Sequence, residues 1–125
     1  MTDNLDLAKK FYQAWNEKDF ATVRSLVADD YHFKGSIDEF HSADEAFAAF
    51  EKIAPLINGI ELTSIFGSGD QVAAYYIFAC AQPVGNVPTA ELLTFKDGKV
   101  VDSRIFYDAR SFAGAMELPP VKDTM

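Results

Sequence analysis

Glu91 is the residue with the clearest capacity for chemistry, because its carboxyl group lies in the largely apolar run Thr89–Phe95. A carboxyl group that faces an apolar cavity loses solvation, which raises its pKa. A glutamic acid that titrates near neutral pH can donate a proton to a carbonyl oxygen or move one between two atoms. Alternatively, Glu91 faces solvent or pairs with Arg104 on a neighbouring strand. We predict that Glu91 is an acid–base group.

The histidines and the cysteine are weaker candidates. His32 shares its strand face with Lys34, and His41 lies in a loop before a helix. Cys80 lies in an apolar run, so we interpret it as a buried, inert thiol. No spacing of histidine, cysteine and carboxylate side chains indicates a metal site, and no glycine-rich loop indicates a nucleotide. We therefore expect neither a metal nor a cofactor.

Composition limits the class of protein. The chain has 125 residues, 49% hydrophobic and 14% aromatic, which suffices for one domain with a core and an aromatic-lined pocket. A net charge of -8 without a basic stripe argues against a nucleic-acid partner. No apolar run reaches the roughly 18 residues of a membrane span. The absence of a secretion signal and the single cysteine predict a cytoplasmic protein.

Helices are predicted in the first half of the chain. Apolar residues at helical spacing predict an amphipathic helix over residues 4–17, and Asp19 is the expected N-cap of a short second helix. Ser42 and Glu45 form a capping box that begins a third helix, and Asn58-Gly59 is the expected end of that helix.

Strands are predicted in the second half, after one short strand between the second and third helices. The predicted strands are residues 31–35, 60–66, 71–82, 89–95 and 100–107. Asp108 is the expected cap of a last short helix over residues 110–116. This order predicts an α+β domain over residues 1–118, with a tail at 119–125. Helices across a strongly curved antiparallel sheet leave a pocket between them.

The register of the last hairpin decides which way Glu91 points. A two-residue Asp97-Gly98 turn places Glu91 opposite Arg104, whereas a three-residue loop over residues 96–98 places it opposite Ser103. We prefer the second register because it gathers the more apolar face. That face, assigned inward, comprises Thr89, Glu91, Leu93, Phe95, Val101, Ser103, Ile105 and Tyr107. For the strand over 71–82, both faces are apolar and periodicity does not choose between them.

Two segments carry a resemblance to a known family. The run FYQAWNEKDFATVRSLVADDYHF resembles the opening of nuclear transport factor 2-like domains, particularly the SnoaL-like branch. LLTFKDGKVVDSRIFYDARSF resembles their closing hairpin and final helix. The resemblance covers nearly the whole chain and implies a cone-shaped α+β fold. This superfamily hosts isomerases, cyclases, epoxide hydrolases, dehydratases and non-catalytic binders, so the fold alone does not imply an activity.

Ketosteroid isomerases of this superfamily use a tyrosine, a carboxylate base and a protonated acid. By resemblance, the tyrosine position falls on Phe11, with Tyr12 one residue away, and the base position falls on Gly35. Only the third position keeps an acid, Glu91. Without a base, abstraction of a proton next to a carbonyl is not expected.

Limonene-epoxide-hydrolase-like members use an Asp–Arg–Asp set, which falls here on Ala79, Ile77 and Ile105 and is therefore absent. The same resemblance implies that Tyr75, Ile77 and Ala79 face inward on the long strand.

The expected lining of the pocket combines these assignments. It consists of Phe11, Trp15, Tyr31, Phe33, Tyr75, Ile77, Glu91, Leu93, Ser103, Ile105 and Tyr107. We expect a SnoaL-like pocket protein that binds a small apolar carbonyl or aromatic compound. Such a protein would be a cofactor-free isomerase, cyclase or lyase in which Tyr75 and Tyr107 orient the oxygen for Glu91. The alternative is a non-catalytic ligand-binding or dimerisation domain. A homodimer contact is expected on the outer sheet face, with Phe106, Tyr76 and Phe78 as candidates.

Overall fold

The computed structural model describes residues 3–112. The helices are α1 (Asn4–Asn16), α2 (Phe20–Ser25) and α3 (Ala43–Ile53), with two 3-10 turns, η1 (Ala54–Leu56) and η2 (Ala109–Phe112). The strands are β1 (Val27–Lys34), β2 (Glu39–Phe40), β3 (Ile57–Ser68), β4 (Gln71–Cys80), β5 (Asn86–Lys96) and β6 (Lys99–Phe106). The expected α+β class is confirmed.

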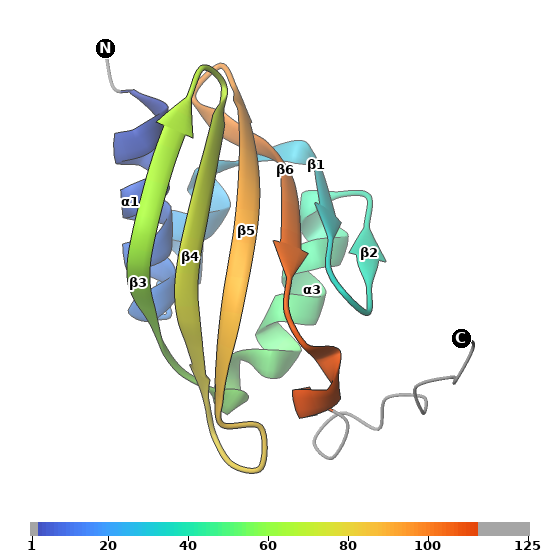
Figure 1. Ribbon diagram of the computed structural model, residues 1–125. Helices are drawn as coiled ribbons and strands as arrows, with labels where there is room; N and C mark the ends of the chain where they lie inside the picture. Colours follow the sequence, from blue (N-terminus) through green and yellow to red (C-terminus); the bar gives the residue numbers. More distant parts are fainter. Residues whose placement is uncertain (1–2, 113–125) are drawn as a thin grey trace, which may run out of the picture.

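The strands form one curved, unclosed sheet in the order β2-β1-β6-β5-β4-β3 (Figure 1). Every pairing is antiparallel except that between β1 and β6, which run parallel. Helix α1 packs against the β3 side of the sheet and α3 against β1. The curvature holds the helices away from the middle of the concave face, where side chains from both layers surround a space.

Side-chain caps begin each helix, and those of α2 and α3 are the caps that the sequence predicts. Asp3 accepts a hydrogen bond from the Asp6 amide at 2.8 Å, and Ser42 accepts one from the Glu45 amide at 3.1 Å. Asp19 caps α2 by accepting from the Thr22 amide. These bonds satisfy backbone donors that have no partner within the first helical turn.

The predicted end of the third helix at Asn58-Gly59 is wrong. Helix α3 ends at Ile53 and passes into a 3-10 turn that contains Pro55, because proline cannot continue an α-helical hydrogen-bond ladder. Asn58-Gly59 lies in β3. Gly59 is needed there because the side chain of Asn16 approaches closely, and a Cβ at Gly59 would lie 2.7 Å from the Asn16 Oδ1.

The last hairpin follows neither predicted register. Its turn is the two-residue Asp97-Gly98, with positive φ at both positions, so the preferred three-residue loop is wrong. A bulge that follows the turn shifts the pairing, and Glu91 therefore lies opposite Ile105. Because of the bulge, Glu91, Ser103 and Ile105 share the inward side of the sheet, as predicted.

The predicted inward face of the long strand is wrong. Tyr75 is 51% exposed, and Ile77 lies beside it on the outer face, whereas Tyr76 is buried. The pairing with β5 decides this, because directly opposite residues point to the same side. Tyr76 lies opposite Thr89, which is buried on the inward side.

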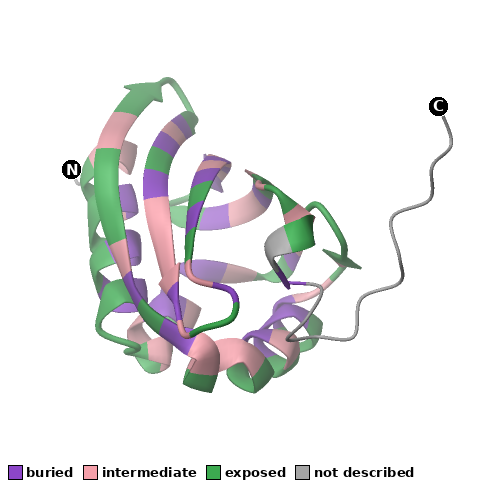
Figure 2. Cartoon of the chain, turned by 60° about the horizontal axis from the view of Figure 1, so that its bottom comes forward, coloured by how far each residue is buried: buried purple, intermediate pink, exposed green. Residues whose placement is uncertain are grey.

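Buried and exposed segments alternate along the strands (Figure 2). The core on the concave side is rich in aromatic rings. Other large apolar residues are exposed, on strands of the sheet or, for Ile37, in the loop that lines the cavity. These exposed residues are Ile37, Leu62, Phe66, Tyr75 and Phe106. Strand β3 lies at one edge of the sheet and pairs, within residues 3–112, only with β4.

The chain end is described only in part. The predicted last helix is a 3-10 turn over Ala109–Phe112, and Asp108 accepts a hydrogen bond from the Arg110 amide at 3.0 Å. The rest of that predicted helix and the predicted boundary between residues 118 and 119 lie outside the described residues.

Candidate functional site

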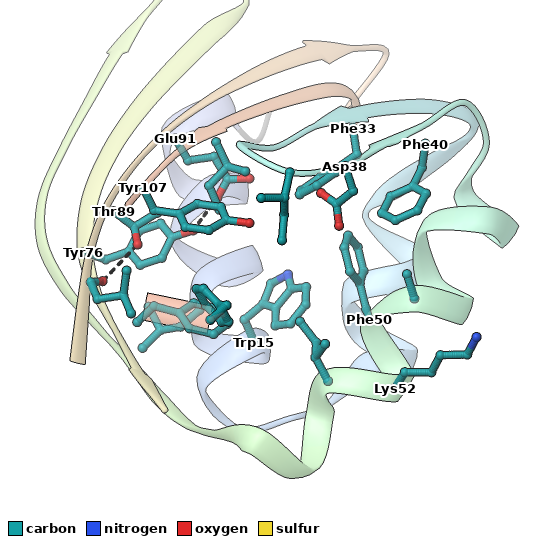
Figure 3. Close-up of a pocket in the computed structure, with 18 of the residues that line it drawn as sticks. Trp15, Phe33, Asp38, Phe40, Phe50, Lys52, Tyr76, Thr89, Glu91 and Tyr107 are labelled. Atoms are coloured by element: carbon teal, nitrogen blue, oxygen red, sulfur yellow. Dashed lines mark hydrogen bonds between the residues drawn. The ribbon is translucent and has the colours of Figure 1, made fainter. Parts of the chain in front are cut away.

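A cavity of about 370 Å³ lies between the concave face of the sheet and the helices (Figure 3). This volume suits a compact organic molecule. Of the predicted lining residues, seven line it: Phe11, Trp15, Tyr31, Phe33, Glu91, Ile105 and Tyr107. Leu93 and Ser103 are fully buried beneath the cavity wall and do not line it. Tyr75 and Ile77 lie on the opposite face of the sheet, as described above.

Glu91 lies deep in this cavity and is only 7% exposed. Two tyrosines donate to the same carboxyl oxygen: Tyr12 at 3.0 Å and Tyr76 at 2.9 Å from Oε1. Burial raises the pKa of Glu91 to about 7, although the hydrogen bonds from the tyrosines oppose this by stabilising the carboxylate. At neutral pH, a carboxyl group with this pKa is protonated in about half of the molecules and ionised in the rest.

The two tyrosine hydroxyls stay protonated at neutral pH and can therefore donate to Glu91. Burial, together with the negative charge of Glu91, holds the pKa of both the Tyr12 and Tyr76 hydroxyls well above the ordinary tyrosine value. Since both protons point at Oε1, the Oε2 atom is the one free to carry the Glu91 proton. The buried Ser103 hydroxyl lies near Glu91 but has no hydrogen-bond partner of good geometry among the described residues.

A second carboxyl group, that of Asp38, lies at the mouth of the cavity. Asp38 belongs to the loop between β1 and β2, and its side chain turns toward the cavity (Figure 3). The residue as a whole is exposed, yet partial burial of the carboxyl raises its pKa. The negative charge of Asp38 also adds to burial in raising the pKa of Tyr107, so these two side chains face a common region.

The absence of a side chain at Gly35 creates the space for Asp38. A Cβ at Gly35 would lie 2.8 Å from the Asp38 Oδ1. The Gly35 amide also donates to the Asp38 carbonyl at 2.8 Å, which closes the loop. Gly35, the position of the base that the resemblance implies, has no side chain, but the carboxyl group of Asp38, three residues further along, lies beside it.

The loop that carries Asp38 is tied to the end of β6. The Ser36 hydroxyl donates to the Tyr107 carbonyl at 2.9 Å and accepts from the Tyr107 amide at 3.2 Å. These two bonds hold Asp38 and Tyr107 on adjacent segments of the cavity mouth.

Residues 8–103 match the sequence profile of the SnoaL-like domain. The chain belongs to the SnoaL-like family. No curated protein sequence matches it.

Solved structures support the same fold for this SnoaL-like chain. A protein from Kribbella flavida is 29% identical, with a TM-score of 0.81, and the alignment covers 88% of this chain and 90% of that one. A protein from Catenulispora acidiphila with a ketosteroid isomerase-like fold, crystallised with trimethylamine, is 16% identical, with a TM-score of 0.75 and coverage of 91% and 94%. An LEH-like epoxide hydrolase from M. tuberculosis is 15% identical, with a TM-score of 0.73 and coverage of 86% and 84%.

Sequence reasoning missed several residues of the SnoaL-like cavity. Tyr12, Asp38 and Tyr76 contribute polar groups, and the aromatic wall includes Phe40 and Phe50. Tyr12 stood one position from the tyrosine site that the resemblance implies. The signal for Asp38 was a carboxyl group three residues beyond the implied base position. For Tyr76, no local signal separates the two faces of an entirely apolar strand.

The remaining candidates lie away from the cavity. Burial raises the pKa of Cys80 to about 11, which fits the predicted inert thiol. His32 lies on the outer face of the sheet, where it contacts Asp102 and Glu39. No helix in the described part of the chain is long and apolar enough to cross a membrane.

Proposed function

We propose that this SnoaL-like protein is a cofactor-free enzyme that moves a proton on a small apolar carbonyl compound, as an isomerase or lyase does. One observation carries the proposal: two carboxyl groups with raised pKa values, Glu91 in the depth and Asp38 at the mouth, share one apolar cavity. Pairs of acids held in different environments can divide the roles of proton donor and base.

In the proposed mechanism, the carbonyl oxygen of the substrate lies at Glu91 and its α-carbon faces Asp38. The Asp38 carboxylate takes a proton from the α-carbon. The electron pair of that C–H bond moves into a new carbon–carbon double bond, and the carbonyl oxygen takes the proton from Glu91 Oε2. In a β,γ-unsaturated carbonyl compound this intermediate is a dienol. Asp38 then delivers its proton to the γ-carbon, the oxygen proton returns to Glu91, and the double bond moves into conjugation with the re-formed carbonyl, which completes an isomerisation. Tyr12 and Tyr76 stabilise the Glu91 carboxylate left behind, since both donate to it.

Tyr107 has a positioning part in this proposal. Its side chain lines the same cavity and points into it (Figure 3), and its raised pKa keeps its hydroxyl protonated. A neutral hydroxyl there can donate to a substrate oxygen without competing for the transferred proton.

The test uses exchange of the α-protons of cyclohexanone in D2O, followed by NMR, since this step does not require the natural substrate. We expect Asp38→Asn and Glu91→Gln each to slow catalysed exchange by about 100-fold, the usual scale of general acid–base catalysis. Asp30→Asn and Glu61→Gln change exposed carboxylates of the same types and serve as matched controls that should keep the full rate. Exchange by the two cavity variants at the rate of the unaltered protein would rule out this mechanism.

A second candidate function, dimerisation, is favoured by the outer face of the sheet. Tyr75 is 51% and Phe106 62% exposed, and they lie together beside a shallow groove that also includes Pro88. We propose that this face is the contact between two copies of the chain, since contiguous exposed aromatic residues need cover. The predicted contacts Tyr76 and Phe78 are wrong because both line the cavity.

Light scattering after size-exclusion chromatography tests the dimer. The unaltered protein should have the mass of two chains and Phe106→Lys that of one, whereas a monomeric unaltered protein would contradict the proposal. We place the protein in the cytoplasm as part of the same proposal, in keeping with the unpaired, buried Cys80.

A further inference from the structure

The outer face of the sheet brings together two histidines and a carboxylate whose side chains do not line the cavity. His32, Glu39 and His41 each offer one ligand atom, and these atoms lie within 4.8 Å of one another. The His32 Nε2 is 2.6 Å from the Glu39 Oε2, and the His41 Nε2 is 4.0 Å from the same oxygen. Only two histidines occur in the chain, and both are in this cluster.

Strand geometry explains why these three side chains meet. Tyr31 and Phe33 point into the cavity, so His32 between them points outward. Strand β2 pairs with β1 through Phe33 opposite Phe40, and Glu39 therefore also points outward. His41 follows β2 directly, and its ring centroid lies 5.2 Å from that of His32.

A fourth residue orients the first histidine. Asp102 lies opposite His32 in the parallel pairing of β1 and β6, and its Oδ1 is 2.8 Å from the His32 Nδ1. Because the Asp102 carboxylate accepts, the Nδ1 of His32 carries the proton and donates it, and Nε2 is the ligand nitrogen, whose own proton a bound metal ion would displace. This carboxylate–histidine arrangement is the usual support of a metal-bound imidazole.

We propose that His32, Glu39 and His41 bind a divalent transition-metal ion of the zinc type, with Asp102 as the residue that positions His32. Two imidazole nitrogens and one carboxylate oxygen suit zinc and its neighbours, whereas calcium and magnesium prefer an all-oxygen site. Bonds of about 2.0 to 2.1 Å to a tetrahedral ion need ligand atoms somewhat over 3 Å apart. The ion would therefore separate His32 from Glu39 slightly and draw in His41, whose side chain is exposed and free to turn.

Neighbouring cations limit the affinity. Lys34 Nζ lies 3.9 Å from the Glu39 Oε1, and Arg104 Nε lies 3.7 Å from the Asp102 Oδ2. Both carboxylates are thus partly neutralised before a metal arrives. With three protein ligands and a solvent-facing position, binding should be weaker than at a closed four-ligand structural zinc site.

A bound ion would restrain the loop between β1 and β2. The ligands flank this loop, which carries Asp38 to the cavity, and Phe40 of β2 lines the same cavity. A bound ion would hold β2 against β1 from the outer side and so reduce the motion of Asp38 at the cavity mouth. The metal proposal does not depend on the proposed catalysis, because the ligands and the cavity lie on opposite sides of the sheet.

Calorimetric titration of the tag-free chain with zinc chloride tests the site directly. We expect one ion per chain, and at least a tenfold loss of affinity in His41→Gln and in Glu39→Gln. Asp102→Asn should weaken binding by about 10-fold, the scale of lost outer-sphere support. Glu61→Gln, an exposed glutamate of β3, is the matched control and should bind zinc as the unaltered chain does.

Two further measurements make the result decisive. Cobalt bound in place of zinc should give an absorption spectrum of nitrogen and oxygen ligands without a thiolate band, which would exclude Cys80. Zinc should raise the melting temperature of the unaltered chain and not that of Glu39→Gln. The proposal is overturned if the unaltered chain takes up no zinc, or if the His41 and Glu39 variants bind it with unchanged affinity.

Discussion

The two faces of the sheet each hold one titratable side chain between two hydrogen-bond partners. Burial and hydrogen bonding shift the pKa of these two side chains in opposite senses. Inside the cavity, burial raises the pKa of Glu91, while the hydrogen bonds from Tyr76 and Tyr12 lower it. On the outer face, hydrogen bonds to Asp102 and Glu39 raise the pKa of His32, while partial burial lowers it. The same direction of shift therefore favours an uncharged acid on one side and a charged imidazole on the other. A raised pKa therefore points to a catalytic group only when the cause of the shift is known.

The largest expected difference between the two faces is in stability. Glu91→Ala leaves the buried Tyr12 and Tyr76 hydroxyls without their acceptor, at about 1–3 kcal/mol for each unsatisfied group. We expect a loss of about 4 kcal/mol in the free energy of unfolding at pH 5. Asp102→Ala on the partly exposed outer face should cost less than about 1 kcal/mol. Urea denaturation of both variants measures this contrast, and equal losses would remove it.

The next largest effect is the pH dependence that Glu91 imposes. Its pKa is about 7 in the folded protein against 4.5 for the ordinary side chain, so the folded state holds the proton more tightly. The stability from this group is fully present below about pH 4.5 and is lost as pH rises through about 7, by at most roughly 3.5 kcal/mol. Glu91→Gln should flatten the unfolding free energy over this window. An identical pH profile for the variant and the unaltered chain would show that Glu91 does not titrate in this way.

A smaller effect should follow from removal of one tyrosine donor. The hydrogen bonds of Tyr12 and Tyr76 lower the pKa of Glu91, so Tyr12→Phe should raise that pKa further. The expected change corresponds to about 1 kcal/mol, the net value of one such bond. The carboxyl carbon signal of Glu91, followed by NMR across pH, measures it. A lower pKa in the variant would contradict the assigned role of the tyrosine.

The smallest expected effect on stability belongs to Gly35. An alanine Cβ there would displace the Asp38 carboxyl, at 2.8 Å, and press on Phe33, at 3.2 Å. Because the carboxyl is the mobile end of an exposed side chain, we expect Gly35→Ala to cost less than about 1 kcal/mol. It should nevertheless slow α-proton exchange about as much as Asp38→Asn does. Full exchange activity in this variant would separate Asp38 from the chemistry.

Much of the scaffold could be predicted because its signals are local. Each helix begins with a side chain that accepts a hydrogen bond from the amide three residues further along, as at Asp3, Asp19 and Ser42. A short stretch of sequence is therefore enough to locate the start of each helix. The end of α3 was missed because Pro55 ends the helix before the glycine that would otherwise mark its end.

The site was less predictable because it depends on pairing between distant strands. Glu91 was placed on the correct side although the turn was wrong. The actual turn is one residue shorter than the predicted loop, and the extra residue of the bulge, between Val100 and Asp102, makes up the difference. Tyr75 was placed on the wrong side because β4 is apolar on both faces and only its pairing with β5 decides the orientation. The cluster of His32, Glu39 and His41 depends on a two-residue strand, β2, that no sequence pattern predicted.

The edge position of β3 has a consequence for how this protein behaves at high concentration. An unpaired strand edge is a template on which another chain can add a strand. The Ile60 amide donates a hydrogen bond to the Asn16 side chain and so cannot pair with another chain. A bulge between Leu62 and Ser64 interrupts the edge further along. The segment from Ser64 to Ser68 has neither protection and carries the exposed Phe66. Intermolecular strand addition, and with it the onset of fibril growth, should therefore start at the β3–β4 end of the molecule, and a lysine in place of Phe66 should delay it.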